Sequence, residues 1–250
     1  MATGQEKEIP TDGFRHETAV FNPDGTGIMY VQYPDAGSWR DFIYYAPLSS
    51  GLPKKIWDRS LWSWIWDCAP DGKTLLVMAH SDRSGNAGGW RIQELDLDSL
   101  SATAFLYDSS LDLWQAHFSH DGRWVTFNAT KDKEASRVYL VPFRRKAALP
   151  RSEWIAITEG AEGDKPRFSY DDRSIFFRSD RDGTRRIWVQ TLGPHKRPDG
   201  KPIAVYPLGQ SKRAPVISDD DISVGPHLIV FTQVEENGNI WLLEPAFRGR

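Results

Sequence analysis

The segment Phe118-Ser119-His120-Asp121-Gly122, followed by the apolar run Trp124-Val125-Thr126-Phe127, is the clearest indication of fold in this 250-residue chain. An Asp-Gly pair is typical of a tight turn between antiparallel strands, because glycine adopts a positive φ without steric cost. The run after it has the β-branched and aromatic composition of a strand. The segment therefore predicts a β-hairpin whose second strand begins near residue 124.

The same pattern recurs along the chain. Related segments are Phe21-Asn22-Pro23-Asp24-Gly25, Cys68-Ala69-Pro70-Asp71-Gly72 and Phe168-Ser169-Tyr170-Asp171-Asp172. Their first residues are separated by 68−21 = 47, 118−68 = 50 and 168−118 = 50 positions, and an apolar run follows each segment. So steady a period predicts tandem structural units.

Each unit continues with two further predicted strands. The third strand carries an aliphatic–aromatic pair, at Ile43-Tyr44, Val138-Tyr139, Ile187-Trp188 and Ile240-Trp241. A fourth apolar run follows in the first four units, for example Trp154-Ile155-Ala156-Ile157. Four short strands in about 45–50 residues, with no helical period between them, are typical of a propeller blade.

The sequence predicts a single all-β domain over residues 1–250, a five-bladed β-propeller of four-stranded antiparallel blades. The predicted blades span residues 13–58, 62–108, 112–158, 163–207 and 213–245, the last completed by residues 6–12. The sequence of residues 8–13 is similar to that of residues 156–160, which belongs to a predicted fourth strand. We therefore expect the N-terminal strand to close the last blade and cover its sheet edge. The alternative is a fragment of a six- or seven-bladed ring.

The Phe-Ser-x-Asp-Gly, Ser-Asp-Arg-Asp-Gly and Ile-Trp or Val-Tyr phrases resemble the TolB-type, PD40 WD40-like propeller repeats of bacteria. The resemblance covers nearly the whole chain. More narrowly, residues 137–245 are similar to C-terminal propellers of large acidobacterial regulatory or kinase-like proteins. This resemblance implies a propeller fold. It does not specify one function, because such blades serve as docking platforms, ligand binders and peptidase gates. The His and Trp-Asp signature of eukaryotic WD40 blades does not recur through these units.

Composition narrows the function classes. The net charge of −3 argues against a protein that coats nucleic acid, which needs a strong basic excess. No apolar run approaches the roughly 20 residues of a membrane span. The lone Cys68 excludes an internal disulfide and leaves a cytoplasmic or periplasmic location open. No metal-binding motif or catalytic motif is present, so we expect no metal, cofactor or catalytic residue.

Propeller topology places one candidate site at the mouth of the central channel. The innermost strands line the axis, and Glu17, Trp64, Trp114 and Asp164 each stand four residues before the repeat Phe or Cys68. We expect these side chains to converge with their neighbours. The predicted ligand-binding residues are His16, Glu17, Trp62, Trp64, Trp114, Gln115, Asp164, Lys165 and Arg213.

Two readings of this site compete. Indoles beside acidic and basic groups favour a non-catalytic binding or scaffold propeller that takes a protein, peptide or glycan, such as the sensor module of a larger bacterial regulator. The alternative is a carbohydrate-active hydrolase or lyase that uses funnel carboxylates, the candidates being Glu17, Asp67, Asp112 and Asp164. Alternation predicts that Trp62, Trp64 and Trp66 share one strand face while Ile65 points to the other.

Overall fold

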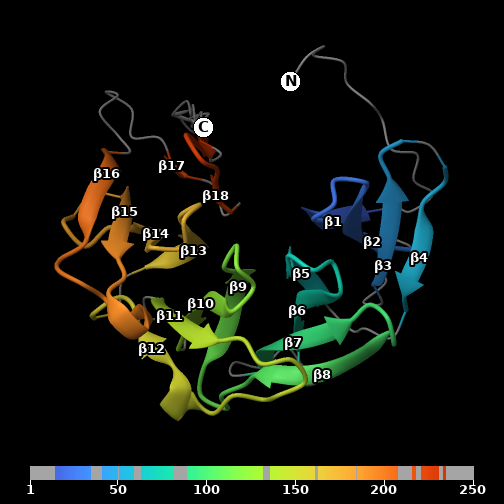
Figure 1. Ribbon diagram of the computed structural model, residues 1–250, viewed down its shortest axis with the longest axis horizontal. Coiled ribbons are helices and arrows are strands. Elements are labelled where there is room, and N and C mark those ends of the chain that lie inside the picture. The colour runs from blue at the N-terminus through green and yellow to red at the C-terminus, as the bar shows by residue number, and fades with distance from the viewer. Residues whose placement is uncertain are drawn as a thin grey trace, which may run out of the picture.

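Four four-stranded antiparallel sheets make up most of the computed structural model, and they stand side by side along an arc (Figure 1). The structure describes residues 15–34, 41–49, 51–58, 63–80, 89–131, 136–160, 163–183, 185–207, 216–217, 221–230 and 233–234. In each sheet the neighbours in space are also neighbours in sequence, so each sheet is a meander. The predicted all-β fold of four-stranded antiparallel blades is confirmed.

The strands of each blade follow one another from the inside of the arc to its rim (Figure 1). The first blade has β1 (Arg15–Phe21), β2 (Gly27–Tyr33), β3 (Phe42–Pro47) and β4 (Lys54–Trp57). The second has β5 (Ser63–Cys68), β6 (Thr74–His80), β7 (Trp90–Asp96) and β8 (Ser101–Leu106). The third has β9 (Asp112–Phe118), β10 (Trp124–Thr130), β11 (Arg137–Pro142) and β12 (Ile155–Ala156). The fourth has β13 (Asp164–Phe168), β14 (Ser174–Ser179), β15 (Arg186–Thr191) and β16 (Ile203–Pro207).

Two short antiparallel strand pairs follow the fourth blade. Here β17 (Val216–Ile217) pairs with β20 (Gln233–Val234), and β18 (Ser223–Val224) pairs with β19 (Ile229–Val230), both antiparallel. The described sheets do not join into a closed ring, since β1 and β18 lie at the two ends of the arc (Figure 1). The predicted closing strand, residues 6–12, lies outside the described residues, so the count of five blades stays a prediction.

The repeated Asp-Gly turns join the first and second strands of the blades. Gly25, Gly72 and Gly122 have φ of 69–70°, as the turn requires. In the fourth blade Asp172 holds this position at φ 55°. Its carboxylate accepts the backbone N–H groups of His120 and Asp121 at 2.8 and 2.9 Å. Asp172 adopts a positive φ less easily than glycine does, but its carboxylate adds hydrogen bonds between the third and fourth blades.

Apolar side chains fill the space between neighbouring sheets. One cluster joins the first and second blades through Met29, Ile43, Ile65 and Leu75 among others. Similar clusters join the second blade to the third and the third to the fourth. The second strands of the first three blades are therefore buried over most of their length, as in β6, where every residue is buried. Face-to-face packing of twisted sheets holds the inner strands at fixed positions along the inside of the arc.

The basic run Arg144-Arg145-Lys146, between β11 and β12, also makes contacts between blades. Arg145 Nη2 and Lys146 Nζ each lie 3.1 Å from Asp96 Oδ2, and the Lys146 backbone N–H donates to Glu94 at 2.6 Å. Burial raises the pKa of Glu94 above its ordinary range, although the Lys146 N–H and Arg145 oppose this. The run thus serves to tie the third blade to the second.

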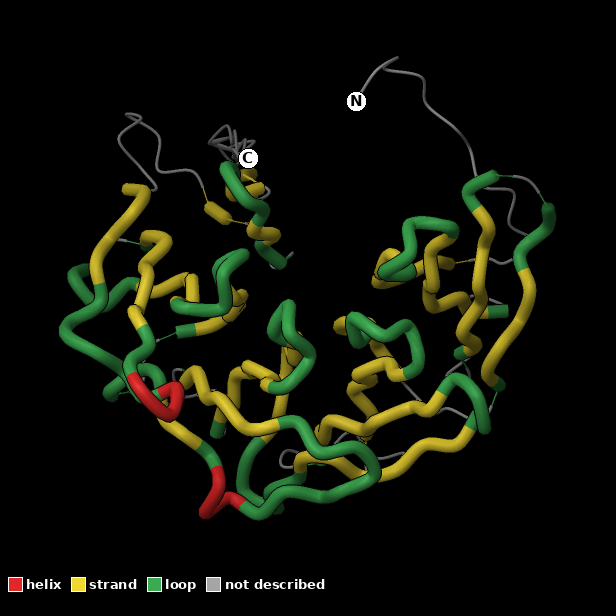
Figure 2. The backbone as a smooth tube through the Cα atoms, in the orientation of Figure 1, coloured by secondary structure: helices red, strands yellow, loops and turns green. Residues whose placement is uncertain are grey.

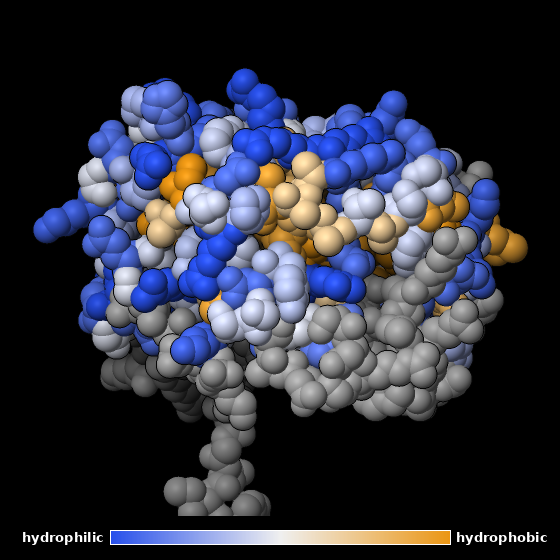
Figure 3. Space-filling view, turned by 90° about the horizontal axis from the view of Figure 1, so that it is seen from below, coloured by the Kyte–Doolittle hydropathy of each residue, from blue (hydrophilic) through white to orange (hydrophobic). Residues whose placement is uncertain are grey.

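The rim of the molecule carries the irregular structure. Two 3₁₀ helices, Arg151–Glu153 and Pro194–Lys196, lie at the outer edge (Figure 2). The space-filling view shows this rim as largely hydrophilic, with apolar side chains gathered in a band (Figure 3). No described helix has the length and apolar character needed to cross a membrane.

Candidate functional site

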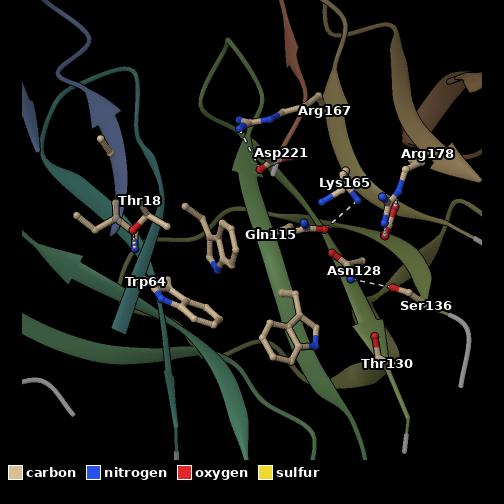
Figure 4. Close-up of a pocket in the computed structure, with 15 residues that line it drawn as sticks. Thr18, Trp64, Gln115, Asn128, Thr130, Ser136, Lys165, Arg167, Arg178 and Asp221 are labelled. Atoms are coloured by element: carbon tan, nitrogen blue, oxygen red, sulfur yellow. Dashed lines mark hydrogen bonds and ion pairs between the residues drawn. The ribbon is translucent and has the colours of Figure 1, made fainter. Parts of the chain in front are cut away.

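A cavity of about 800 Å³ lies where the innermost strands of four blades converge. β1, β5, β9 and β13 supply most of its wall, and β10, Ser136 just before β11, β14 and the segment before β18 supply the rest (Figure 4). Its lining residues are Thr18, Ala19, Trp64, Ile65, Trp66, Trp114, Gln115, Asn128, Thr130, Ser136, Asp164, Lys165, Arg167, Arg178 and Asp221. The volume falls within the range of small-molecule sites.

A register shift in each innermost strand sets the direction of the side chains at this cavity. The shifts lie between Glu17 and Ala19, between Ile65 and Asp67, opposite residues 126–128, and between Asp164 and Arg167. Such β-bulges turn a strand locally and redirect its side chains. Thr18, Gln115 and Lys165 consequently have positive φ values of 35°, 51° and 54°.

The bulges of adjacent blades are bonded to one another. Thr18 Oγ1 accepts the backbone N–H of Ile65 at 3.2 Å, and Gln115 Oε1 accepts that of Lys165 at 2.9 Å (Figure 4). In both cases a side chain at a bulge reaches the corresponding position of the next blade. The cavity wall is therefore held by hydrogen bonds between blades as well as by packing.

Tryptophans from the second and third blades form one wall, which we call the indole wall: Trp64, Trp66 and Trp114, backed by Trp90. Trp64 stacks on Trp90 with ring centroids 5.7 Å apart and planes at 5°. Trp114 lies 6.0 Å from Trp64 and 5.6 Å from Trp90, and Trp66 lies 6.2 Å from Trp64. All four are half-buried against the core between these blades. The wall is apolar and supported from behind, and the planes of Trp114 and Trp66 are tilted by 34° and 69° from that of Trp64.

The opposite side, which we call the charged wall, consists of ion pairs. The guanidinium group of Arg178 makes a bidentate contact with the Asp164 carboxylate, with Nε donating to Oδ1 at 2.7 Å (Figure 4). Arg167 Nη2 lies 3.1 Å from Asp221 Oδ2, and its Nε donates to the Ile222 carbonyl at 2.7 Å. Each arginine is thus fixed in position by a carboxylate.

A buried histidine extends the charged wall. His117 is 1% exposed on its side chain, and its Nε2 lies 2.7 Å from Asp221 Oδ2. Its Nδ1 lies 3.8 Å from Asp67 Oδ2, which also accepts the Phe118 N–H at 2.9 Å. Burial alone would raise the pKa of Asp221, but Arg167 and His117 hold it well below its usual range. The Asp221 carboxylate is therefore charged at neutral pH.

Five of the nine sequence-predicted site residues line this one cavity: Trp64, Trp114, Gln115, Asp164 and Lys165. His16 is exposed on β1, its ring 5.6 Å from Tyr30, and it is not part of the lining. The Glu17 side chain, Trp62 and Arg213 lie outside what the structure describes. The predicted alternation is confirmed for the described residues, because Ile65 packs in the core between the first and second blades, whereas Trp64 and Trp66 pack against the core between the second and third.

The described candidate carboxylates are engaged in structural contacts. Asp67 accepts the N–H groups of Cys68 and Phe118, and Asp112 accepts that of Trp90 at 3.3 Å. Of the described candidates, only Asp164 lines the cavity, where Arg178 binds it. Within the described part of the chain, no group of three His, Cys, Asp or Glu side chains is arranged to hold a metal.

Several lining residues are not among those predicted from the sequence, namely Asn128, Arg167, Arg178 and Asp221. A signal for two of them was present in the repeat. Asp67, His117 and Arg167 each stand directly before the repeat Cys or Phe, and Asp221 stands directly before Ile222. Arg167 and Asp221 at this position line the cavity, whereas Asp67 and His117 are not part of the lining, although His117 contacts Asp221. Asn128 and Arg178 lie on second strands, which the repeat alone presents as core.

Comparisons with known proteins support the fold. No protein-family model and no curated protein matches the sequence. Among solved structures, TolB from Acinetobacter baumannii is 19% identical with a TM-score of 0.60, and the match covers 88% of this chain and 52% of that one. The putative TolB from Agrobacterium tumefaciens is 20% identical with a TM-score of 0.62, and the match covers 81% and 69%.

Hydrazine synthase from Kuenenia stuttgartiensis also matches, with 14% identity, a TM-score of 0.58, and coverage of 85% of this chain and 59% of that one. The chain spans about half the length of the Acinetobacter TolB. The predicted likeness to TolB-type propellers is thus confirmed for the fold. Proteins of unrelated names share this fold, so function depends on the site.

Proposed function

We propose that this chain is a non-catalytic binding propeller that takes its ligand in the cavity between the indole wall and the charged wall. The observation that carries the proposal is the indole wall itself. Three indoles line one cavity and a fourth supports them, and such rings bury apolar area with little loss of entropy. The ligand would be a protein segment, a peptide or a glycan. In this proposal the predicted residues Trp64, Trp114, Gln115, Asp164 and Lys165 form the site.

The engaged carboxylates favour binding over hydrolysis. A glycosidase needs one carboxyl group free to donate a proton and a second positioned across the scissile bond. Asp164 makes a bidentate contact with Arg178, and the pKa of Asp221 lies below its ordinary range. Neither arrangement suits a general acid at neutral pH.

Intrinsic tryptophan fluorescence tests the binding proposal. We expect one or more members of a peptide and glycan panel to change the emission of the wild-type protein, and Trp64→Leu or Trp114→Leu to abolish the response. Trp57→Leu is the matched control, because Trp57 is a half-buried indole on the outermost strand β4. A response that survives in both cavity variants would place the ligand elsewhere and refute the proposal.

We also propose that residues 6–12 complete the blade of residues 213–245 and close a five-bladed ring, within the sensor module of a larger bacterial regulator. The two short pairs β17–β20 and β18–β19 support a further blade after the fourth. Removal of residues 1–12 should then lower the urea midpoint of unfolding substantially. An unchanged midpoint would contradict closure by this strand.

A further inference from the structure

The charged wall offers a ligand few uncompensated charges. Asp164 and Arg178 neutralise one another, as do Asp221 and Arg167. Lys165 lines the cavity but is 1% exposed, so it offers a ligand little accessible surface. A charged ligand would have to compete with an existing ion pair, whereas a neutral polar ligand can bond to the outer lone pairs and N–H groups of these pairs.

Two polar atoms beside the cavity have no hydrogen-bond partner among the described residues. Asn128 is 4% exposed, and its Nδ2 donates to Ser136 Oγ at 2.7 Å while its Oδ1 has no partner (Figure 4). Exchanging the amide N and O would leave Nδ2 unpartnered instead. Trp66 Nε1 is the second such atom. Buried polar groups are normally bonded, so these atoms point to a missing partner.

The unpartnered pair combines an acceptor with a donor. A hydroxyl group can satisfy either, since it both donates and accepts. Thr130 and Ser136 add hydroxyl groups to the same lining. The polar part of the cavity therefore matches a neutral ligand that carries several hydroxyl groups.

The indole wall requires an apolar face on the same ligand. A pyranose ring has this combination, because its axial C–H groups form an apolar face and its hydroxyl groups surround the ring edge. C–H groups are attracted to the negative face of an aromatic ring. Resting on the function proposed above, we infer that the ligand is a neutral sugar, with the ring stacked on the indole wall and its hydroxyl groups bonded to Asn128 and the charged wall.

Saturation-transfer NMR on the full chain tests this inference with a panel of methyl hexopyranosides, cellobiose, and the tripeptides Ala-Ala-Ala and Ala-Tyr-Ala. We expect saturation of at least one sugar, strongest on the C–H protons of one ring face. Trp64→Leu keeps an apolar side chain and removes the flat ring, so it should abolish the signal. Asn128→Leu should weaken binding about fivefold to tenfold through loss of one hydrogen bond.

Trp57→Leu is the control and should bind the sugar as the wild type does, and thermal unfolding verifies that each variant is folded. Sugar binding that persists in folded Trp64→Leu and Asn128→Leu would overturn the inference. Signals from the tripeptides alone would overturn the sugar assignment while leaving the binding function standing. Signals from neither class would overturn both.

Discussion

The two walls of the cavity are built by different physical means. The indole wall belongs to the second and third blades and is continuous with the apolar core between them. The charged wall comes from the fourth blade and the segment before β18, and arginine–carboxylate pairs hold it together. One wall depends on contact area, the other on charge. We therefore expect the contribution of the indole wall to stability to be insensitive to pH, and that of the charged wall to weaken in acid.

The largest expected effect is on the indole wall. Trp64→Ala removes an indole that contacts Trp66, Trp90 and Trp114, and it should lower the free energy of unfolding by about 3 kcal/mol. Urea unfolding followed by far-UV circular dichroism measures the change. The loss should be the same at pH 5 and pH 8, because no charge is removed. A loss that varies strongly between these pH values would contradict the comparison.

The matched variant on the charged wall is Asp221→Asn. Asparagine keeps the shape and can still accept the Ile222 N–H, but it leaves the charge of Arg167 uncompensated. Because the pair is partly exposed, we expect a loss of about 2 kcal/mol at pH 7, measured by the same urea series. An equal cost from Asp98→Asn, whose side chain is outside the cavity, would show that the pair has no special role.

The pH dependence follows from the lowered pKa of Asp221. Its folded pKa lies below that of the unfolded chain, about 3.9. Its contribution to stability is therefore complete above that pH and is lost as pH falls through the folded pKa. The difference between wild type and Asp221→Asn should shrink below about pH 4. A difference that stays constant down to pH 2 would contradict the proposed role of this charge.

The smallest expected effect is at Cys68, which ends the strand that carries Trp64 and Trp66. Burial, together with the charge of Asp67, raises the pKa of the Cys68 thiol to about 12. At pH 8 only about one thiol in ten thousand is then ionised, so iodoacetamide should label the folded protein very slowly. Mass spectrometry measures the label, and urea-unfolded protein is the control. Rapid labelling of the folded chain would show that the strand behind the indole wall opens.

The blades could be predicted because each is encoded locally. An Asp-Gly turn, an apolar run and an aliphatic–aromatic pair recur at a steady spacing, and each signal depends on near neighbours in sequence. The positions of Trp64, Trp114 and Asp164 at the cavity followed from the same repeat. The repeat did not predict the bulges, where register shifts accompany a positive φ at Thr18, Gln115 and Lys165.

The remaining site residues depend on pairings between blades. Asn128 and Arg178 have the sequence surroundings of core strands, and only the neighbouring blades show that they border a cavity. His117 and Asp221 stand 104 residues apart and meet at 2.7 Å. No local pattern encodes such a contact, because it exists only once the blades have curved around an axis.

Local sequence specifies the repeat, the four-stranded blade and the strand that faces the axis, since turn chemistry and alternation act over a few residues. The tertiary structure decided which wall is apolar and which is charged. It also decided that Asp164 is bound by Arg178 and that Asp172 ties two blades together. These outcomes depend on long-range packing, in which each buried polar group must find its partner wherever the fold brings one within reach.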